Sequence, residues 1–495
     1  MKPEVLKEKL REALWQVVDR HAAVLSATLT GSFVDNPSLE GISDIDFVLV
    51  LDEINAPRFD ALHADFATTL TPILRDAGFR LHINATLGPL KFNEPDLAVL
   101  HLMLYSHQGH VDHVVQSPFT CLDWQRSSHY RKQSLADVYP VFALQPRHFL
   151  GSRRSLSDYL RDFRDNTVSY RELICNEVGY QEAKRGKPMT LRDRHEFAYH
   201  VIRFLMRNLL KLVHRQHEVP SGAAMMEAFF ELFPERQTAI TDFFTKLTIK
   251  KRALDFRDPI ANLDTELEAF LAVYEQQFRE AFFTEASRHL IFRHAETPSN
   301  RSSDGQVRFL GRSNPGIGPV ASSAWDQLSE QAAELQPTAI YSSPLMRCVE
   351  SLGKIGLTPT QHDDRLLEID YGAVEGLTIA EARQQHPSLF AAWAQGEDAP
   401  FPGGENSTMV LHRIKSFIAD HWGRAKGDTI TCTHNVVLRC LVGEVMGVPM
   451  SDWHRLRIGH LAPITFVHTK RFGLFIDLHD AVERDIFQHY ATKAG

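Results

Sequence analysis

The chain has 495 residues and a formal net charge of -8, from 54 Lys and Arg against 62 Asp and Glu. This length exceeds one ordinary core and predicts two or three domains. The acidic balance provides no general attraction to nucleic acid or to an anionic membrane, which argues against both as partners. No apolar run of about 18 residues occurs, and the charged stretch 1–10 lacks the apolar core of a signal peptide. We expect a cytoplasmic protein.

Five cysteines are scattered along the chain: Cys121, Cys175, Cys348, Cys432 and Cys440. Their number is odd and no two of them form a CxxC pair, which argues against a disulfide framework and against a thiolate zinc site. We expect reduced and mostly buried thiols.

The first chemically informative stretch follows a helix predicted over residues 3–27 and a strand predicted over 26–30. Gly31-Ser32 and a short loop lead into a strand over 44–51, in which Asp44 and Asp46 point to one face because side chains alternate along a strand. Neighbouring carboxylates repel one another unless a cation lies between them. Oxygen ligands of this kind favour Mg or Mn.

Gly31-Ser32 followed by Ser43-Asp44-Ile45-Asp46 resembles the polymerase-beta-type nucleotidyltransferase superfamily. The resemblance implies an α+β domain over residues 1–120 in which Gly31 and Ser32 approach a nucleoside triphosphate. It implies that Asp44 and Asp46 hold metal ions during nucleotidyl transfer to an acceptor that the sequence does not identify.

A third carboxylate is usual in that family, but here His101 takes its expected position, on a strand over 97–105 that follows a hairpin strand over 79–87. Several alternatives remain open. His101 completes a metal site, Asp96 or Asp112 reaches in, His101 is a core residue, or the site binds nucleotide without turnover.

Residues 121–285 show apolar side chains three and four positions apart, which predicts a helical bundle. The expected helices cover 156–177, 191–214, 223–233, 239–254 and 263–283. Lys184, Arg185 and Lys187 between two of them form either a solvated loop, which we favour, or a phosphate-binding one.

Strands and helices alternate from residue 286 to 495, which predicts a mainly parallel sheet with helices on both faces, a three-layer α/β domain. The expected strands are 289–293, 338–341, 428–432, 462–468 and 472–478, and the expected helices are 319–335, 344–353, 377–386, 407–424 and 435–446. In such a sheet the site forms beyond the carboxyl ends of the strands.

Three of these strand ends carry reactive side chains: Arg293-His294, Ser342-Ser343 leading to Arg347, and Thr433-His434. A neutral imidazole can attack phosphorus when one ring nitrogen is held by a hydrogen bond. Guanidinium groups provide planar donors for phosphate oxygens. The sequence therefore predicts phosphoryl transfer at this edge.

With Leu366 to Gly372 and Pro402 to Asn406, these motifs resemble the histidine phosphatase superfamily, its phosphoglycerate mutase-like group. The resemblance implies that His294 becomes phosphorylated and that Arg293, Arg347 and His434 surround the phosphoryl oxygens. It implies that no metal is needed at this site. The resemblance also implies that Glu368 is the proton donor and that Asn300 and Arg312 take the family's secondary phosphate and loop positions. Asn435, which we also expect to bind substrate, replaces the more usual Gly after the second His.

Two residues near this site stay open. Glu375 is an alternative acid or a structural residue, and Arg439 either reaches the substrate or pairs with a surface acid. Segment 377–406 is expected to roof the pocket. The residues do not separate mutase from phosphatase; we expect a phosphatase acting on a small phosphomonoester.

The whole sequence thus predicts a bifunctional, multidomain α/β enzyme that combines a histidine phosphatase with a metal-dependent nucleotidyltransferase. The alternative is a histidine phosphatase whose amino-terminal half senses nucleotide or docks a partner without catalysis.

Overall fold

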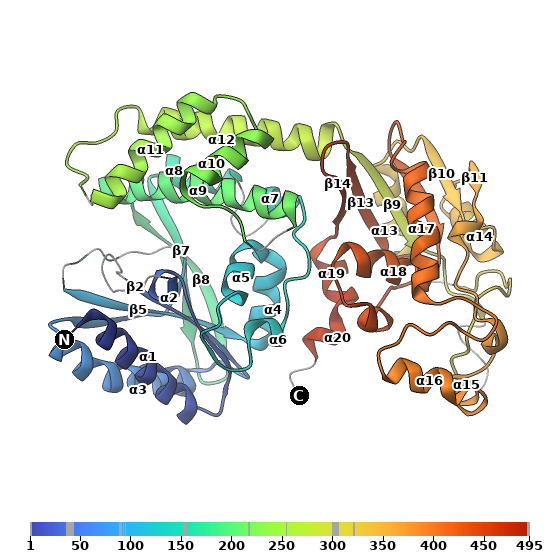
Figure 1. The fold of residues 1–495 in the computed structure, drawn as a ribbon, viewed down its shortest axis with the longest axis horizontal. Helices are drawn as coiled ribbons and strands as arrows, with labels where there is room; N and C mark the ends of the chain where they lie inside the picture. Colours follow the sequence, from blue (N-terminus) through green and yellow to red (C-terminus); the bar gives the residue numbers. More distant parts are fainter. Residues whose placement is uncertain are drawn as a thin grey trace. The chain divides into compact units, whose positions relative to one another are not determined.

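A computed structural model describes residues 2–35, 44–88, 92, 94, 96–151, 156–215, 218–253, 255–298, 306–319 and 322–492. The chain divides into two compact units (Figure 1). Unit 1 comprises Met1–Glu275 and Tyr490–Gly495, and unit 2 comprises Gln276–His489.

Unit 1 is built on a five-stranded sheet, in which β2 and β5 are parallel neighbours and β1 runs antiparallel to β2. The strands in spatial order are β3 (Arg80–Asn84), β5 (Leu97–Ser106), β2 (Asp44–Leu51), β1 (Val24–Thr30) and β6 (Tyr130–Lys132). Helices α1 (Pro3–Arg20) and α3 (Ala56–Asp76) share the main core with one face of this sheet.

The alternation of β2 decides where its aspartates point. Ile45, Phe47 and Leu49 pack into the core with α1 and α3, whereas Val48 and Val50 belong to a second cluster on the opposite face. Because successive side chains alternate, Asp44 and Asp46 share the face of Val48. The two carboxylates therefore lie on the side of the sheet away from α1 and α3.

The remaining elements of unit 1 include a β-hairpin in the region predicted to be helical. They are α2 (Ser32–Asp35), β4 (Thr86–Leu87), α4 (His107–Gln116), α5 (Pro118–Gln125), α6 (Leu135–Val138), α7 (His148–Gly151), α8 (Leu156–Arg164), β7 (Thr167–Cys175), β8 (Tyr180–Pro188), α9 (Leu191–His214), α10 (Gly222–Leu232), α11 (Gln237–Ala253) and α12 (Leu263–Arg279), which runs into unit 2. Strands β4, β7 and β8 form a three-stranded antiparallel sheet.

Three sequence predictions are wrong here. The expected helix over 156–177 ends at Arg164, and the chain turns into strand β7, which pairs with β8. The expected hairpin strand over 79–87 is two strands, β3, which runs parallel to β5, and β4, which pairs with β7. Lys184, Arg185 and Lys187 consequently lie in strand β8 and not in a loop.

Unit 2 contains a six-stranded sheet in which β11, β10, β12 and β9 are parallel neighbours, as predicted. Strand β13 runs antiparallel to β9, and β14 runs antiparallel to β13. In spatial order the strands are β11 (Gln361–His362), β10 (Ala339–Ser342), β12 (Thr429–Thr433), β9 (Ser287–Arg293), β13 (Pro463–Thr469) and β14 (Gly473–Asp477). The strands expected at 289–293, 338–341, 428–432, 462–468 and 472–478 are confirmed to within two residues at each end.

Helices connect the strands of this sheet. They are η1 (Glu280–Thr284), α13 (Ser322–Ala333), α14 (Met346–Lys354), η3 (Asp364–Leu366), η4 (Gly372–Val374), α15 (Ile379–Gln385), α16 (Pro387–Ala394), α17 (Ser407–His421), α18 (Asn435–Val445), η5 (Met450–Arg455), α19 (Asp480–Ile486) and α20 (Gln488–Ala491), which spans the end of unit 2. Buried residues of β9, β12, α13 and α14 form one core cluster. Such packing places the carboxyl ends of β9, β10 and β12 at one edge of the sheet.

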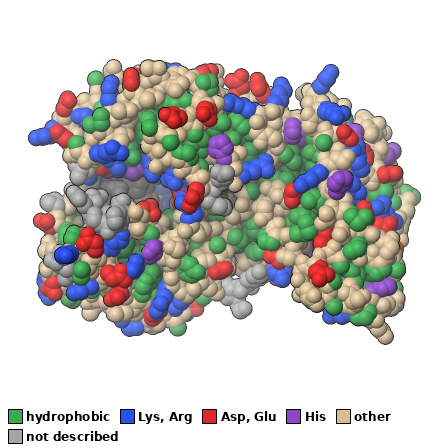
Figure 2. All heavy atoms as spheres, in the orientation of Figure 1, with side chains coloured by type: hydrophobic (Ala, Val, Ile, Leu, Met, Phe, Trp, Pro, Cys, Tyr) green, Lys and Arg blue, Asp and Glu red, His purple; other side chains and the backbone are tan. Residues whose placement is uncertain are grey.

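Within the described residues, no helix is both long and apolar enough to cross a membrane. Figure 2 shows acidic and basic side chains interspersed on the face that it draws. The five cysteines are free thiols, and Cys121, Cys348, Cys432 and Cys440 are buried.

Candidate functional site

His294 follows the last residue of β9, and its hydrogen bonds fix which ring nitrogen carries the proton. Nδ1 lies 2.6 Å from the carbonyl oxygen of Ala295. A carbonyl only accepts, so Nδ1 donates and a neutral ring keeps its lone pair on Nε2. The ring is 4% exposed. Burial, followed by the charge of Arg347, holds the pKa of His294 well below 6.5, so the ring is neutral.

Arg347, on the first turn of α14, joins the two imidazoles. Its Nε donates to Nε2 of His294 over 3.1 Å and to Nδ1 of His434 over 3.3 Å. Its terminal nitrogens donate to the carbonyl oxygens of Ser313 and Gly311 at 2.6 and 2.8 Å. The guanidinium is fully buried. Four hydrogen bonds therefore hold one positive charge against the candidate nucleophile.

His434 is the residue directly before α18, and a serine side chain orients its ring. Its Nε2 lies 2.8 Å from Oγ of Ser343, at the end of β10, and its Nδ1 accepts from Arg347. Burial, together with the neighbouring His294, holds the pKa of His434 well below 6.5. The rings of His294 and His434 lie 5.1 Å apart between centroids, at 62°. The structure thus places two neutral imidazoles around one guanidinium.

Arg293 directly precedes His294 and has an unused donor. Its Nη1 donates to the carbonyl of Ile458 over 2.9 Å, but its Nε is buried and has no hydrogen-bond partner in the described part of the chain. Burial, and then the positive charges of Arg439 and Arg347, lower the pKa of Arg293 to about 10. A buried, unpaired guanidinium donor is costly unless an anion occupies the site.

Glu368 lies between η3 and η4, and its buried carboxyl faces the amino terminus of α18. It is 4% exposed and accepts from the backbone N–H groups of Ile369 and Val436, each through Oε1, at 3.0 and 3.1 Å. Burial raises the pKa of Glu368, against the opposing effects of the Ile369 N–H and of Arg347. The carboxyl therefore retains a proton to higher pH than an exposed glutamate.

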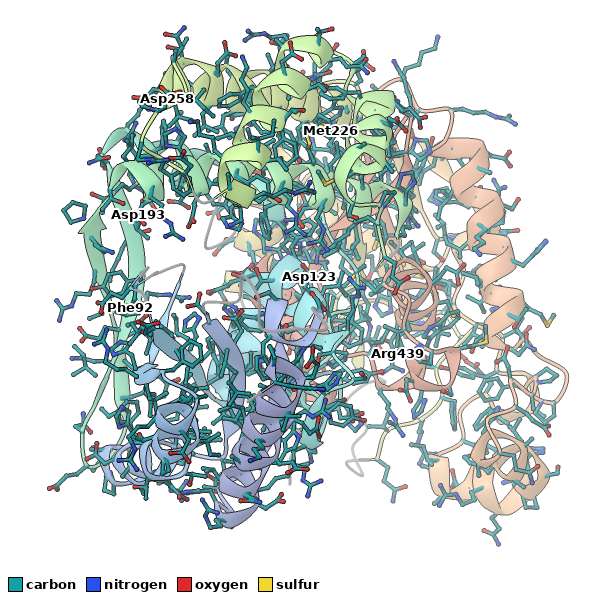
Figure 3. The ribbon with its side chains drawn as sticks, turned by 60° about the vertical axis from the view of Figure 1, so that its left-hand side comes forward. Phe92, Asp123, Asp193, Met226, Asp258 and Arg439 are labelled. Carbon is teal, nitrogen blue, oxygen red and sulfur yellow. The ribbon has the colours of Figure 1, made fainter. Side chains whose placement is uncertain are left out.

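The other predicted substrate contacts are placed as follows. Arg312 pairs with Glu405 at 3.2 Å, and its Nε is buried without a partner among the described residues. Arg439, labelled in Figure 3, donates from Nε to the carbonyl of Leu456 over 2.8 Å. Asn435 begins α18, and its Oδ1 is buried without a partner in the same described set. Asn300 lies outside the described residues.

The sequence left the role of Glu375 open, and in the structure its carboxylate holds a loop beside the site. Its carboxylate accepts from the backbone N–H of Gly311 at 3.0 Å and from that of Ser313 at 3.1 Å. The backbone carbonyls of the same two residues, Gly311 and Ser313, accept hydrogen bonds from Arg347. Glu375 and Arg347 therefore bind the same loop.

Sequence reasoning missed His460, in the loop between η5 and β13. Its Nδ1 donates to the carbonyl of His294 over 2.8 Å, and the two rings lie 5.6 Å apart. A lone histidine 166 positions from its partner carries no local pattern. Only the sheet, which places β13 beside β9, brings the two together.

The second predicted site lies on β2 and β5 of unit 1. Asp46 and His101 are register partners on these parallel strands. Gly31, with φ of 71°, lies against Asp46, and a Cβ at position 31 would collide with Oδ2 of Asp46. Ser32 begins the short helix α2. The structure thus brings Gly31 to the carboxylate.

His101 does not act as a third carboxylate would. Its Nδ1 lies 3.1 Å from Oδ1 of Asp46 and its Nε2 lies 2.8 Å from the carbonyl of Thr86. Both partners only accept, and this geometry favours the protonated ring, in which both nitrogens donate. Burial lowers the pKa of His101, but the hydrogen bond and charge of Asp46 outweigh it and the net shift is upward.

This geometry bears on the metal ions that the resemblance implies. In the described residues no group of three or more His, Cys, Asp or Glu is placed to hold a metal ion. Asp96 and Asp112 do not line the cavity that contains Asp44, Asp46 and His101. A cation at the third position repels Mg²⁺ or Mn²⁺. The residues therefore do not fit a pair of divalent ions.

Comparisons with known proteins bear on unit 2. Residues 289–480 match the histidine phosphatase superfamily (branch 1). A relative, the bifunctional protein Rv2228c of Mycobacterium tuberculosis, is 35% identical over 136 residues, which are 26% of this chain and 35% of that protein. The chain thus spans about a third of the length of this relative.

Two further proteins match the same region. Phosphoserine phosphatase 1 of Hydrogenobacter thermophilus is 26% identical over 172 residues, 33% of this chain and 78% of that protein. The solved structure of a mycobacterial glucosyl-3-phosphoglycerate phosphatase is 22% identical, with a TM-score of 0.32, over 39% of this chain and 99% of that one. The carboxyl-terminal part of this chain, residues 289–480, therefore belongs to the histidine phosphatase superfamily.

Proposed function

We propose that unit 2 hydrolyses a small phosphomonoester through a phosphohistidine formed on His294. One observation carries this proposal. Nδ1 of His294 is bound to the Ala295 carbonyl, which leaves the Nε2 lone pair beside Arg347 and His434. An imidazole held in this tautomer is a nucleophile, and fixed cationic donors stabilise the charge that develops on the phosphoryl oxygens.

In the first step, Nε2 of His294 attacks phosphorus and the P–O bond to the leaving alcohol breaks. The leaving alkoxide takes the proton of Glu368, whose raised pKa keeps that proton available. Arg293 and Arg347 donate hydrogen bonds to the oxygens of the transferred group. His434 joins them once the phosphoryl group displaces Arg347 from its Nδ1 and that nitrogen takes up a proton. The products of this step are the free alcohol, phospho-His294 and the Glu368 carboxylate.

In the second step, a water molecule attacks phosphorus and the P–N bond breaks. The Glu368 carboxylate takes a proton from this water, which restores the starting acid. Inorganic phosphate leaves and His294 is neutral again. The chain's residues thus perform two in-line displacements and return to their starting protonation states.

Hydrolysis and mutase chemistry differ in what reaches phospho-His294. A mutase protects it until a second acceptor alcohol arrives, whereas a phosphatase admits water. Segment 377–406, which contains α15 and α16, is the proposed roof. The relative named a phosphoserine phosphatase supports hydrolysis, and we propose water as the acceptor.

The test is hydrolysis of p-nitrophenyl phosphate by the wild-type chain and by His294→Ala. We expect the substitution to lower kcat/KM by about 1000-fold or more, because it removes the nucleophile. His412→Ala, on the exposed side of α17, is the matched control and should leave the rate unchanged. A rapidly quenched reaction with labelled substrate should give an acid-labile adduct only while His294 is present. Full activity of His294→Ala would refute the proposal.

For unit 1, we propose that Gly31, Ser32, Asp44 and Asp46 bind a nucleoside triphosphate. Transfer of its nucleotidyl group to a small acceptor is one candidate function of this site. The close approach of Gly31 to Asp46 supports this site. The imidazolium of His101 favours the alternative, in which the unit binds nucleotide without catalysis.

Pyrophosphate release separates these two functions. The full chain would be incubated with each nucleoside triphosphate, Mg²⁺ and a metabolite extract, beside the double variant Asp44→Asn/Asp46→Asn and the control Asp112→Asn. Release that requires Asp44 and Asp46 supports transfer. Binding of nucleotide without release supports the non-catalytic alternative, and absence of both would refute the proposal for unit 1.

A further inference from the structure

Unit 1 contains a cavity of about 480 Å³, and Asp44, Asp46 and His101 account for only one part of its wall. Other parts come from β7, β8, the short helix α7 and the long helix α9. Two polar side chains in this wall, His148 and Asn208, are almost completely buried. Neither belongs to the predicted nucleotidyltransferase residues.

His148, the first residue of α7, presents a donor without a partner. The ring is 3% exposed, and its Nδ1 accepts from the backbone N–H of Gln145 over 3.1 Å. Burial, with the adjacent charge of Arg147, holds the pKa of His148 well below 6.5, so the ring is neutral and its proton is on Nε2. This Nε2 is buried and has no hydrogen-bond partner among the described residues.

Asn208, in the middle of α9, adds an amide to the same wall. The residue is 2% exposed, and its Oδ1 is buried without a hydrogen-bond partner in the part of the chain that the structure describes. An unpaired buried donor or acceptor costs about 1–3 kcal/mol, so such groups are rarely retained without a partner. A ligand that pairs with both groups removes this cost.

The surroundings of these two groups are aromatic. The ring of Phe119 lies 6.3 Å from that of His148 and 4.8 Å from that of Phe149, in edge-to-face contacts. Tyr159 and Phe204, whose ring centroids are 6.4 Å apart, also line the cavity. An apolar wall with a few convergent polar groups is typical of a site for a flat ring with a polar edge.

Lys184, on β8, supplies a positive charge to the cavity. Its side chain is exposed, and it forms no ion pair or hydrogen bond with the described residues. Its register partner Arg171, which also lines the cavity, is paired with Glu182 at 2.9 Å. Lys184 is therefore a cation available to an anionic group on a ligand, whereas Arg161, which also lines the cavity, is paired with Asp158.

We propose that this cavity binds a ligand with a planar nitrogen heterocycle and an anionic group, in which His148 and Asn208 hydrogen bond the ring edge and Lys184 pairs with the anion. Nucleosides and their phosphates have this chemistry. The inference rests on the proposed nucleotide binding by unit 1 and assigns the residues that select the ring. It does not require nucleotidyl transfer.

The experiment is calorimetric titration of the full chain carrying His294→Ala, so that unit 2 does not hydrolyse the probes. The probes are adenosine, guanosine, cytidine, uridine and their 5′-monophosphates. For the nucleoside that binds most tightly, His148→Phe and Asn208→Leu should each raise Kd about 10-fold or more, since each removes one buried hydrogen bond. His148→Gln keeps an N–H donor and should bind within a few fold of the parent.

Lys184→Met should weaken the monophosphate and leave the nucleoside unchanged. The matched controls are His214→Phe, at the exposed end of α9, and Lys246→Met, on α11; both should bind like the parent. Thermal unfolding of each variant shows whether it is folded. Equal losses for His148→Phe and His148→Gln would indicate a structural role and overturn the inference.

Two other results distinguish this inference from the proposed function. If nucleotides bind and the binding depends on Asp44 and Asp46 but not on His148 or Asn208, nucleotide binding stands and the ring-edge assignment fails. If no nucleoside and no nucleotide binds, both fail.

Discussion

Nε of Arg347 lies 3.1 Å from Nε2 of His294, on the side of the ring that carries the lone pair. The same N–H is 3.3 Å from His434, so one donor is shared by two acceptors. An incoming phosphoryl group has to replace this contact with its own oxygens. The free site is thus already arranged around the position that the phosphorus atom would take.

Replacing Arg347 with Lys tests whether the hydrogen bonds of Arg347 to both histidines matter for catalysis. An ammonium group keeps the charge but cannot donate at once to two imidazoles and to the carbonyls of Gly311 and Ser313. We expect kcat for p-nitrophenyl phosphate to fall roughly 100-fold. Arg424→Lys, at an exposed position after α17, is the control and should behave as the wild type. A rate within threefold for Arg347→Lys would contradict this account.

The pH dependence follows from the pKa shifts of His294 and Glu368. The pKa of His294 is lowered from 6.5, so the ring loses its proton at lower pH than an exposed histidine and the acid limb of kcat/KM should lie below pH 6.5. The pKa of Glu368 is raised from 4.5, so the protonated acid persists to higher pH and is lost as the pH rises through the raised value. A pH–rate profile with an alkyl phosphate measures both limbs. An acid limb at or above pH 6.5 would be inconsistent with the buried neutral ring.

Glu368→Gln should separate substrates by their leaving groups. The amide cannot donate a proton to an alkoxide, so we expect an alkyl phosphate such as glycerol phosphate to lose about 100-fold or more in kcat. p-Nitrophenolate leaves without a proton, so its ester should be affected much less. Equal losses on both substrates would mean that Glu368 acts by position and not as an acid. Glu375→Gln, which alters the loop 311–313, serves for comparison and should not show this leaving-group dependence.

His101→Asp would restore the carboxylate that the nucleotidyltransferase resemblance expects. Removal of one positive charge and addition of one negative charge beside Asp46 should strengthen Mn²⁺ binding about 10-fold. Electron paramagnetic resonance of free Mn²⁺ in titrations of the chain measures this affinity. His101→Asn removes the cation without adding a ligand charge and should give a smaller gain. If His101→Asp binds no more Mn²⁺ than the wild type, the imidazolium is not what opposes the metal.

The part of the fold that sequence predicts well is the part whose elements obey local patterns. His294, Arg347 and His434 follow strands or begin helices with clear apolar runs, so their convergence follows from parallel topology alone. Leu156, Tyr159 and Phe163 have helical spacing and lie in α8, whereas Val168 and Leu173, within the helix predicted over 156–177, lie in β7. The pairing of β7 with β8, which decides the strand, is a tertiary effect.

The remaining site residues have no local signal. His148 and Asn208 matter because their buried polar atoms lack partners, and only coordinates show burial. His460 is found through its contact with the His294 carbonyl, across two antiparallel strands. A single polar residue of this kind looks the same in sequence whether it packs in a core or faces a ligand.

Two side chains hold the loop that contains Gly311 and Ser313. Arg347 donates to the backbone carbonyls of these two residues, and Glu375 accepts from their backbone N–H groups. Arg312 stands between the two fastened residues, and its own partner is Glu405. Loss of the Arg312–Glu405 pair would therefore leave in place the backbone hydrogen bonds that hold Gly311 and Ser313 to Arg347 and Glu375.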